Sequence, residues 1–222
     1  MNRILSADAK RDFAAISEDL VKLTPRQMAE VFRSLREIGH PQQALLEHML
    51  IHQLVGRDPA TMLDLKVAYP DLPILGTTYR TWAQTDPVAA LEHVKALEND
   101  TWYETGLSSI FRGLGDADPK RGFEALTQMP EATGAHYANL FLSWSTRAPA
   151  EAASAIDEVP EAYRPGALRL LADNWPEIDA RAARAWMDSL PAEQDALARP
   201  TFEARMTQLE NRGIVPGIET GR

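Results

Sequence analysis

The chain repeats a short pattern five times, and this self-similarity limits the folds open to it more than any other feature. In each copy an apolar residue, here called the junction residue, is followed five positions later by a residue that opens a helix, usually proline. The junction residues are Leu54, Trp82, Leu114, Trp144 and Trp175, so the period varies between 28 and 32 residues. Periods of this length are typical of arrays of helical hairpins. The chain is therefore expected to be an all-α repeat protein.

The opening residue of each copy carries a helix-start signal. Three copies place an aspartate before the proline, in Asp58-Pro59, Asp86-Pro87 and Asp118-Pro119. Aspartate at the N-cap accepts a hydrogen bond from an unpaired helix amide, and proline at the first helical position brings a preset φ. The fourth copy keeps the proline, in Ala148-Pro149, and the fifth keeps the acid, in Asp179-Ala180. All five positions are therefore predicted helix starts.

The end of the first helix in each copy is also marked. Three residues after the opener the side chain is small in four copies (Ala90, Gly122, Ala152 and Ala183) and large in one (Met62). Small side chains allow a neighbouring helix to approach closely. A proline then stops the helix in four copies, at Pro70, Pro130, Pro160 and Pro191. A second helix follows, predicted over residues 77–82, 101–114, 132–144 and 164–175, and each ends at the next junction residue.

These units predict one domain over residues 1–222, a right-handed α-solenoid of about six helix-turn-helix repeats of 28–32 residues. Residues 7–53 are predicted to form a capping helix and a divergent first hairpin, in which Pro25 opens one helix and Gly39-His40-Pro41 ends it. Residues 54–199 hold the repeats and residues 200–212 a closing helix. Residues 213–222, with glycine and proline, are expected to be a flexible tail.

With tryptophan, Asp-Pro, a small residue and Leu-Pro at these offsets, the chain resembles the α-solenoid superfamily of tetratricopeptide and HEAT-like repeats. The likeness is greatest to bacterial repeat proteins with units of the form W-x-x-x-D-P-x-x-A ending in L-P, as in residues 82–97 and 144–160. It covers about residues 22–210. The resemblance implies a superhelical scaffold that holds a protein or peptide on its concave side. It implies no shared catalytic motif.

Charge and composition restrict the partners. The net charge is -9, and residues 1–56 carry equal numbers of acidic and basic side chains, so the whole excess lies in the repeats. Such a field repels a phosphate backbone, so direct nucleic-acid binding is not expected and a basic protein surface is the favoured partner. No cysteine is present, which excludes thiolate sites. Neither a signal peptide nor a membrane span is predicted, which favours a cytoplasmic location.

A set of tyrosines suggests where a partner binds. Counted back from the next junction residue, Tyr79, Tyr103 and Tyr137 lie 3, 11 and 7 positions away, which places them near one helical face. Tyrosine with arginine is typical of interface hot spots. The predicted partner-binding residues, on the second helices, are Tyr79, Arg80, Tyr103, Glu104, Arg112, His136, Tyr137, Asn139, Arg164 and Arg169. The alternative interpretation is that these tyrosines, with Tyr163, are ordinary boundary packing, as we predict for the recurring tryptophans.

No catalytic constellation or cofactor motif is evident, and the chain is not expected to be an enzyme. His48 and His52 lie one helical turn apart, a spacing that can chelate zinc, but Glu47 precedes the first histidine where the zincin pattern needs it to follow. The expected function is a non-catalytic scaffold that binds a protein, with self-association into a homo-oligomer if one end is poorly capped. The alternatives are an acidic decoy that mimics nucleic acid and a metal-dependent helical enzyme using these histidines.

Overall fold

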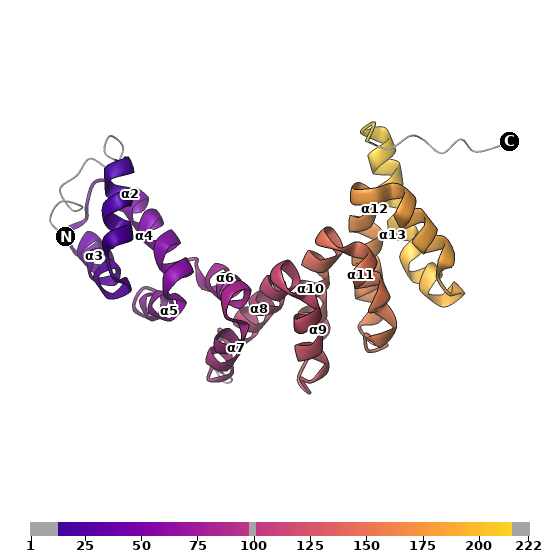
Figure 1. Cartoon of the computed structure of the whole chain (residues 1–222), viewed down its shortest axis with the longest axis horizontal. Helices are drawn as coiled ribbons and strands as arrows, with labels where there is room; N and C mark the ends of the chain where they lie inside the picture. The colour runs from indigo at the N-terminus through magenta and orange to yellow at the C-terminus, as the bar shows by residue number, and fades with distance from the viewer. Residues whose placement is uncertain (1–12, 98–100, 215–222) are drawn as a thin grey trace. The chain divides into compact units, whose positions relative to one another are not determined.

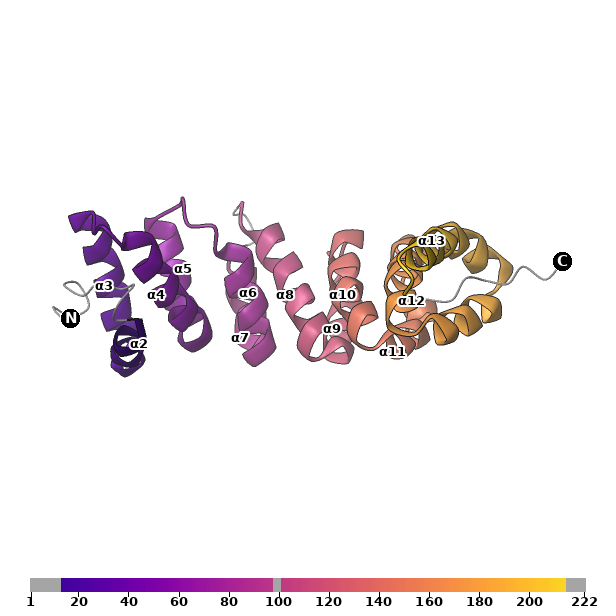
Figure 2. The same cartoon turned by 90° about the horizontal axis from the view of Figure 1, so that it is seen from above.

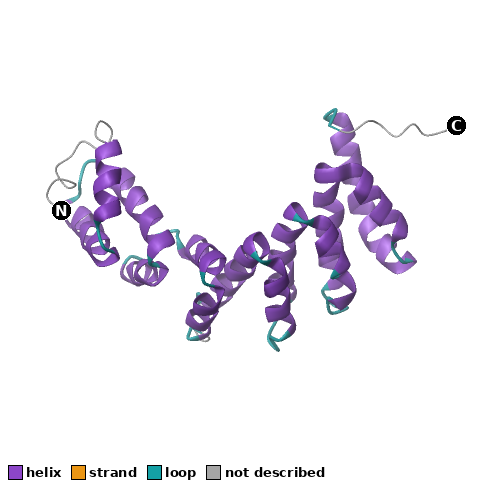
Figure 3. Ribbon diagram, in the orientation of Figure 1, coloured by secondary structure: helices purple, strands orange, loops and turns teal. Residues whose placement is uncertain are grey.

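The computed structural model describes residues 13–97 and 101–214, and these are folded into helices joined by short loops (Figure 3). Twelve α-helices and one 3-10 helix lie within the described ranges, and these ranges contain no strand. The expectation of an all-α protein with many helix-turn-helix units is confirmed.

The chain divides into two compact units, Met1–Gly106 and Leu107–Arg222, whose helices are labelled in Figure 1. Unit 1 contains α2 (Phe13–Lys22), α3 (Pro25–Ile38), α4 (Gln43–Arg57), α5 (Pro59–Ala68), α6 (Leu75–Thr85), α7 (Pro87–Lys95) and the start of α8 (Tyr103–Ala117). Unit 2 contains the rest of α8, then α9 (Pro119–Thr127), α10 (Gly134–Arg147), α11 (Pro149–Ser154), the 3-10 helix η1 (Ile156–Glu158), α12 (Arg164–Ser189) and α13 (Ala192–Asn211).

The Asp-Pro pairs form the same backbone corner each time. Asp58, Asp86 and Asp118 each end one helix and begin the next, with φ between -154° and -143° and ψ between 76° and 81°. Each carboxylate accepts a hydrogen bond from the backbone N–H three residues later, at 3.1 to 3.2 Å. The helices on either side of the first two corners, α4 with α5 and α6 with α7, pack against each other and lie side by side in Figure 2.

The other two copies keep this corner with different residues. Ala148 has φ -144° and ψ 66° but has no side-chain acceptor for the cap. Asp179 has φ -152° and ψ 91°, and its Oδ1 accepts a hydrogen bond from Ala182 N–H at 2.9 Å. Helix α12 is therefore two helices that meet at Asp179, the helix start predicted for the fifth copy.

Several predicted boundaries are corrected. The second helices extend three residues past the junction residue because the N–H of the corner residue still bonds to the carbonyl of that residue, as from Asp86 to Trp82 at 2.7 Å. The closing helix predicted for residues 200–212 begins earlier, at Ala192, and contains Pro200 in its interior. In the first hairpin, Thr24 caps α3 and Gly39, at φ 59°, ends it. Residues 7–12 of the predicted capping helix and residues 215–222 of the predicted tail lie outside the described residues.

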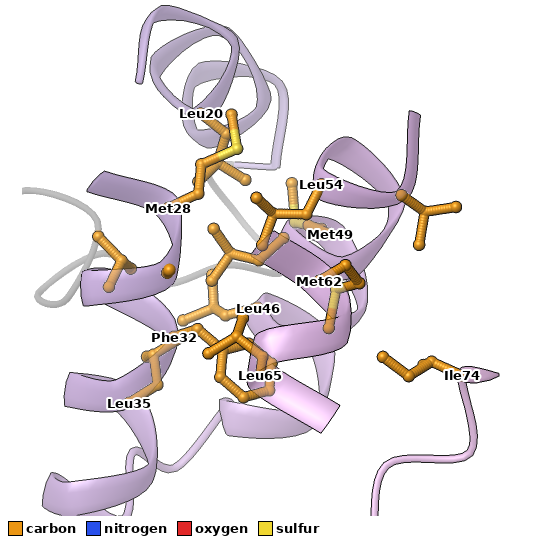
Figure 4. Close-up of a cluster of buried hydrophobic side chains, with 14 of the residues drawn as sticks. Leu20, Met28, Phe32, Leu35, Leu46, Met49, Leu54, Met62, Leu65 and Ile74 are labelled. Carbon is orange, nitrogen blue, oxygen red and sulfur yellow. The ribbon is translucent and has the colours of Figure 1, made fainter. Parts of the chain in front are cut away.

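The core of unit 1 is a continuous apolar cluster between α2, α3, α4 and α5 (Figure 4). Phe32, Leu35, Leu46, Leu54 and Leu65 are completely buried in it. Arg36 closes one edge, because its guanidinium bonds to Glu47 at 2.9 Å and to Asp71 at 2.9 Å and lies over the rings of Phe32 and Tyr69.

In unit 2 two helical glycines lie where a neighbouring helix leaves no room for a side chain. A Cβ added to Gly115 of α8 would lie 2.5 Å from the backbone oxygen of Leu140 in α10. A Cβ added to Gly122 of α9 would lie 2.6 Å from Leu140 Cδ1. The predicted role of the small residue in the first helix, close approach of a neighbouring helix, is confirmed for Gly122. Aromatic packing of Phe123, Phe141 and Trp144 fills the space beside it.

The uncapped corner at Ala148 gives a stability prediction. Its backbone already has the conformation of the three aspartate corners, so Ala148→Asp should supply the missing acceptor to the N–H of Glu151 without moving the chain. We expect the free energy of unfolding to rise by about 1 kcal/mol, the usual effect of an N-cap. Chemical denaturation measures the change. The reverse substitution at an occupied corner, Asp118→Ala, should cost a similar amount, and equal stabilities in all three proteins would contradict this role of the corner.

Candidate functional site

The tyrosines predicted to bind a partner are buried. Tyr79 of α6 has no exposed surface, and its hydroxyl lies 2.8 Å from His93 Nδ1 in α7 and shares a hydrogen bond with it. The Tyr79 ring stacks on Trp82 at 6.3 Å between centroids. Tyr103, at the start of α8, is also buried. The contacts of Tyr79 place its ring in the packing between α6 and α7.

Tyr137 of α10 is buried as well, with 2% of its surface exposed. Its ring centroid lies 5.4 Å from that of Tyr163 and 6.2 Å from that of Phe123. Burial raises the pKa of the Tyr137 hydroxyl above its usual value, and the neighbouring Tyr163 adds to the effect. Tyr163 donates its own hydroxyl to the backbone oxygen of Ala132 at 3.3 Å. The interpretation of these rings as packing residues accounts for all four positions.

Three polar members of the predicted set make bonds within the fold. His136 is fully buried, and its Nδ1 accepts a hydrogen bond from Thr133 N–H at 3.2 Å, which caps α10. Asn139 donates to the carbonyl of Ala135 in the same helix at 2.9 Å. Arg164 donates to the carbonyls of Asp157 and Val159 at the end of η1, at 3.0 and 3.1 Å.

The other four members reach solvent. Glu104 of α8 and Arg169 of α12 are exposed, and Arg80 of α6 and Arg112 of α8 are half-buried. The exposed part of the predicted set is therefore charged rather than aromatic. That these residues bind a partner remains a prediction, and the tyrosine rings could touch one only if the helices around them moved apart.

A more open site lies along α4 in unit 1. A hollow of about 340 Å³ is located between α4 and α6 and is here called the α4–α6 hollow. Ile51, Val55 and Gly56 supply its apolar lining, and the remaining lining residues are His48, His52, Thr77 and Thr81. A second hollow of about 250 Å³, the α2–α4 hollow, is lined by Ser17, Leu20, His48, Met49, His52 and Gln53. The two hollows share both histidines.

His48 and His52 are exposed on one side of α4, between the two hollows. Imidazoles one turn apart can bind a metal ion together, but a closed zinc site has four ligands. Within residues 13–97 and 101–214, no group of three or more histidine, cysteine, aspartate or glutamate side chains is arranged to hold a metal ion. Both histidines line the α4–α6 and α2–α4 hollows.

Sequence reasoning missed these hollows, although a weak signal was present. Ile51 is apolar but only half-buried, and it lies beside the buried stripe of α4, which includes Leu50, Leu54 and Val55. A helix with apolar residues outside its core stripe has a second surface to cover. The contribution of Thr77 and Thr81 depends on how α6 packs against α4, which the repeat pattern does not determine.

The buried contact between Tyr79 and His93 predicts a pH effect in unit 1. Burial lowers the pKa of His93 below its ordinary value of 6.5, against a smaller opposing effect of Asp64. A histidine whose pKa is lowered by folding contributes stability above its unfolded pKa and loses it as the pH falls from that value through the lower folded pKa. We expect the melting temperature to drop more between pH 7.0 and pH 5.0 in the natural protein than in His93→Gln. Identical drops in both proteins would contradict the assignment.

None of the helices that the structure describes combines the length and apolar character that a bilayer-spanning segment needs. Comparisons of the chain with protein-family models, with curated proteins and with solved structures find no match.

Proposed function

We propose that this protein is a non-catalytic interaction module that binds a polypeptide along α4. The observation that carries the proposal is the α4–α6 hollow, an open and mainly apolar surface on two second helices of neighbouring repeats. A hollow of about 340 Å³ has the size of a small ligand pocket and can receive one or two apolar side chains.

The chemistry of the lining is better suited to binding a peptide than to catalysing a reaction. Ile51 is half-buried, and covering its exposed surface would gain free energy at roughly 25 cal/mol per Å² of apolar surface removed from water. Thr77, Thr81 and the two imidazoles can donate and accept hydrogen bonds, as the backbone of a bound segment requires. The lining includes no carboxylate that could serve as a general acid or base beside the histidines.

Site-specific photo-crosslinking tests this proposal. A benzophenone amino acid at Thr77, on the rim of the α4–α6 hollow, should crosslink to one polypeptide in cells that naturally produce the protein. The same amino acid at Glu92, exposed on α7 of the same unit, is the matched control and should give no such product. Equal products from both positions, or none from Thr77, would contradict binding at this hollow.

We further propose that the helical hairpins joined at these repeated corners form an α-solenoid of the tetratricopeptide and HEAT-like kind. Support comes from the recurrence of one backbone conformation at Asp58, Asp86, Asp118, Ala148 and Asp179. Small-angle X-ray scattering is the test. A solenoid should have a radius of gyration well above about 17 Å, the value for a compact globule of 222 residues, and a value near 17 Å would contradict it.

The salt dependence of binding distinguishes this proposal from the alternative that the protein is an acidic decoy mimicking nucleic acid. Binding through apolar contacts at the α4–α6 hollow should change little with ionic strength, whereas attraction between a basic partner and solvated carboxylates weakens as salt screens it. Crosslink yield at Thr77 measured in low and high salt distinguishes the two.

A further inference from the structure

Unit 2 has a hollow of about 250 Å³ between α9 and α11, here called the Trp144 hollow. The side chains of Phe123 and Trp144 line it together with Ala155. Four charged residues also line it: Lys120, Glu124, Glu151 and Glu158. It lies in a different unit from the α4–α6 hollow and involves first helices, so nothing in the proposed function depends on it.

Comparison of the repeats explains why this hollow exists. Eleven residues after Trp82 stands His93, whose ring packs on Trp82 at 5.2 Å between centroids. Eleven residues after Trp175 stands Trp186, whose ring packs on Trp175 at 5.4 Å. The same position after Trp144 is Ala155, which has no ring. The Trp144 hollow therefore lies where two other repeats place an aromatic or imidazole ring against the junction tryptophan.

The rim of the Trp144 hollow is acidic. Lys120 forms an ion pair with Glu151 at 3.3 Å, which leaves Glu124 and Glu158 without an ion-pair partner among the described residues. Both carboxylates are exposed. A bound cation would thus meet two uncompensated negative charges beside two aromatic side chains.

The indole of Trp144 adds an independent sign of an incomplete site. Only 2% of the surface of Trp144 is exposed, and its Nε1 has no hydrogen-bond partner within the described part of the chain. A buried donor without a partner costs on the order of 1 to 3 kcal/mol. The Trp144 side chain, which lines the hollow, therefore retains a hydrogen-bond donor that no group in the described part of the chain uses.

We propose that the Trp144 hollow binds an arginine side chain of a partner polypeptide. The planar guanidinium takes the position that a ring occupies in the Trp82 and Trp175 repeats and lies against the side chains of Phe123 and Trp144 that line the hollow. Its N–H groups donate to Glu124 and Glu158. Arginine fits better than lysine because a flat cation with several donors can satisfy an aromatic surface and two carboxylates together. An acidic or phosphorylated segment is repelled by the same carboxylates.

Nuclear magnetic resonance of the full 15N-labelled chain tests the proposal with a defined probe. N-acetyl-arginine methylamide should shift the indole N–H resonance of Trp144 saturably, with a dissociation constant on the order of millimolar, as befits one side chain. N-acetyl-norleucine methylamide, which is apolar and uncharged, should not. Saturable binding of norleucine as strong as that of arginine would overturn the role of the charge, and no shift with arginine would overturn the site.

Two variants and a control sharpen the result. Replacing Glu124 and Glu158 by glutamine should weaken arginine binding by at least about fivefold, because the donors lose their charged acceptors. Glu203→Gln, at an exposed position of α13, is the matched control and should bind as the natural protein does. Ala155→His restores the ring found at His93, so it should abolish binding while the protein stays folded. Undiminished binding in the double variant or in Ala155→His would overturn the proposal.

Discussion

Gly115→Ala is expected to lower the free energy of unfolding by about 2 to 3 kcal/mol, although alanine is the better helix former. The new Cβ would lie 2.5 Å from the backbone oxygen of Leu140 and 2.9 Å from Ser143 Cβ. A flexible side chain could turn away from such a contact, but a backbone oxygen inside α10 cannot. Helices α8 and α10 must therefore separate, and the apolar contacts around Leu140 loosen with them.

Gly166→Ala is the matched control, because Gly166 is also helical but a Cβ added there meets nothing within 4 Å. Alanine should stabilise this position by about 0.5 to 1 kcal/mol, through helix propensity alone. Urea denaturation of both variants measures the difference. The same sign of change in both would show that the contact with Leu140 is not as close as the structure describes.

Trp144→Ala is expected to cost about 3 to 5 kcal/mol, the range measured for removing a large buried ring. Trp144 is 2% exposed and lies against Phe141 at 5.4 Å and Phe123 at 6.1 Å between ring centroids. The two phenylalanines cannot move together to fill the space, because they belong to α10 and α9. A cavity therefore remains where the junction residue joined the two helices.

The control for this variant is Ile178→Ala, because Ile178 is half exposed in the same unit. Shortening this side chain to alanine should change the free energy of unfolding by no more than about 0.5 kcal/mol. Denaturation followed by circular dichroism measures both. If Trp144→Ala lowered the free energy of unfolding as little as Ile178→Ala does, the result would contradict a structural role for the junction tryptophan.

The helix boundaries of the repeats were predictable because they depend on local chemistry. Asp58, Asp86 and Asp118 cap the next helix with their own side chains, and the following proline sets the direction of the chain. Such signals act within three or four residues and need no knowledge of distant contacts. The closing helix was placed too late, at residues 200–212, whereas α13 begins at Ala192 and continues through Pro200.

The location of the tyrosines could have been inferred from the spacing that grouped them. Tyr79 precedes Trp82 by three residues and Tyr137 precedes Trp144 by seven, so each shares a helical face with its junction residue. Because the junction tryptophans were expected in the core, the tyrosines belong there as well. Spacing identifies a common face but does not say how deeply each side chain on it is buried: Trp144 is buried, whereas Trp82 is only half-buried although Tyr79 on the same face is completely buried.

Neither the Trp144 hollow nor the α4–α6 hollow follows from the sequence pattern that the repeats share. The Trp144 hollow arises because Ala155 replaces a ring, and this becomes visible only when Trp82 with His93 and Trp175 with Trp186 are seen in contact. The α4–α6 hollow depends on the packing of two helices that are separated in sequence by α5. Tertiary packing of this kind lies beyond local sequence signals.

The crosslink at Thr77 in two variants of Gly56 tests the binding of a polypeptide at α4 most directly. Gly56 lines the α4–α6 hollow, and a Cβ added there meets nothing within 4 Å, so both Gly56→Ala and Gly56→Phe should fold. A phenyl ring fills the hollow and should reduce the crosslink yield by about tenfold or more, equivalent to about 1.4 kcal/mol of lost binding. The alanine variant should crosslink as the natural protein does. Equal yields from the phenylalanine and alanine variants would contradict the proposed function.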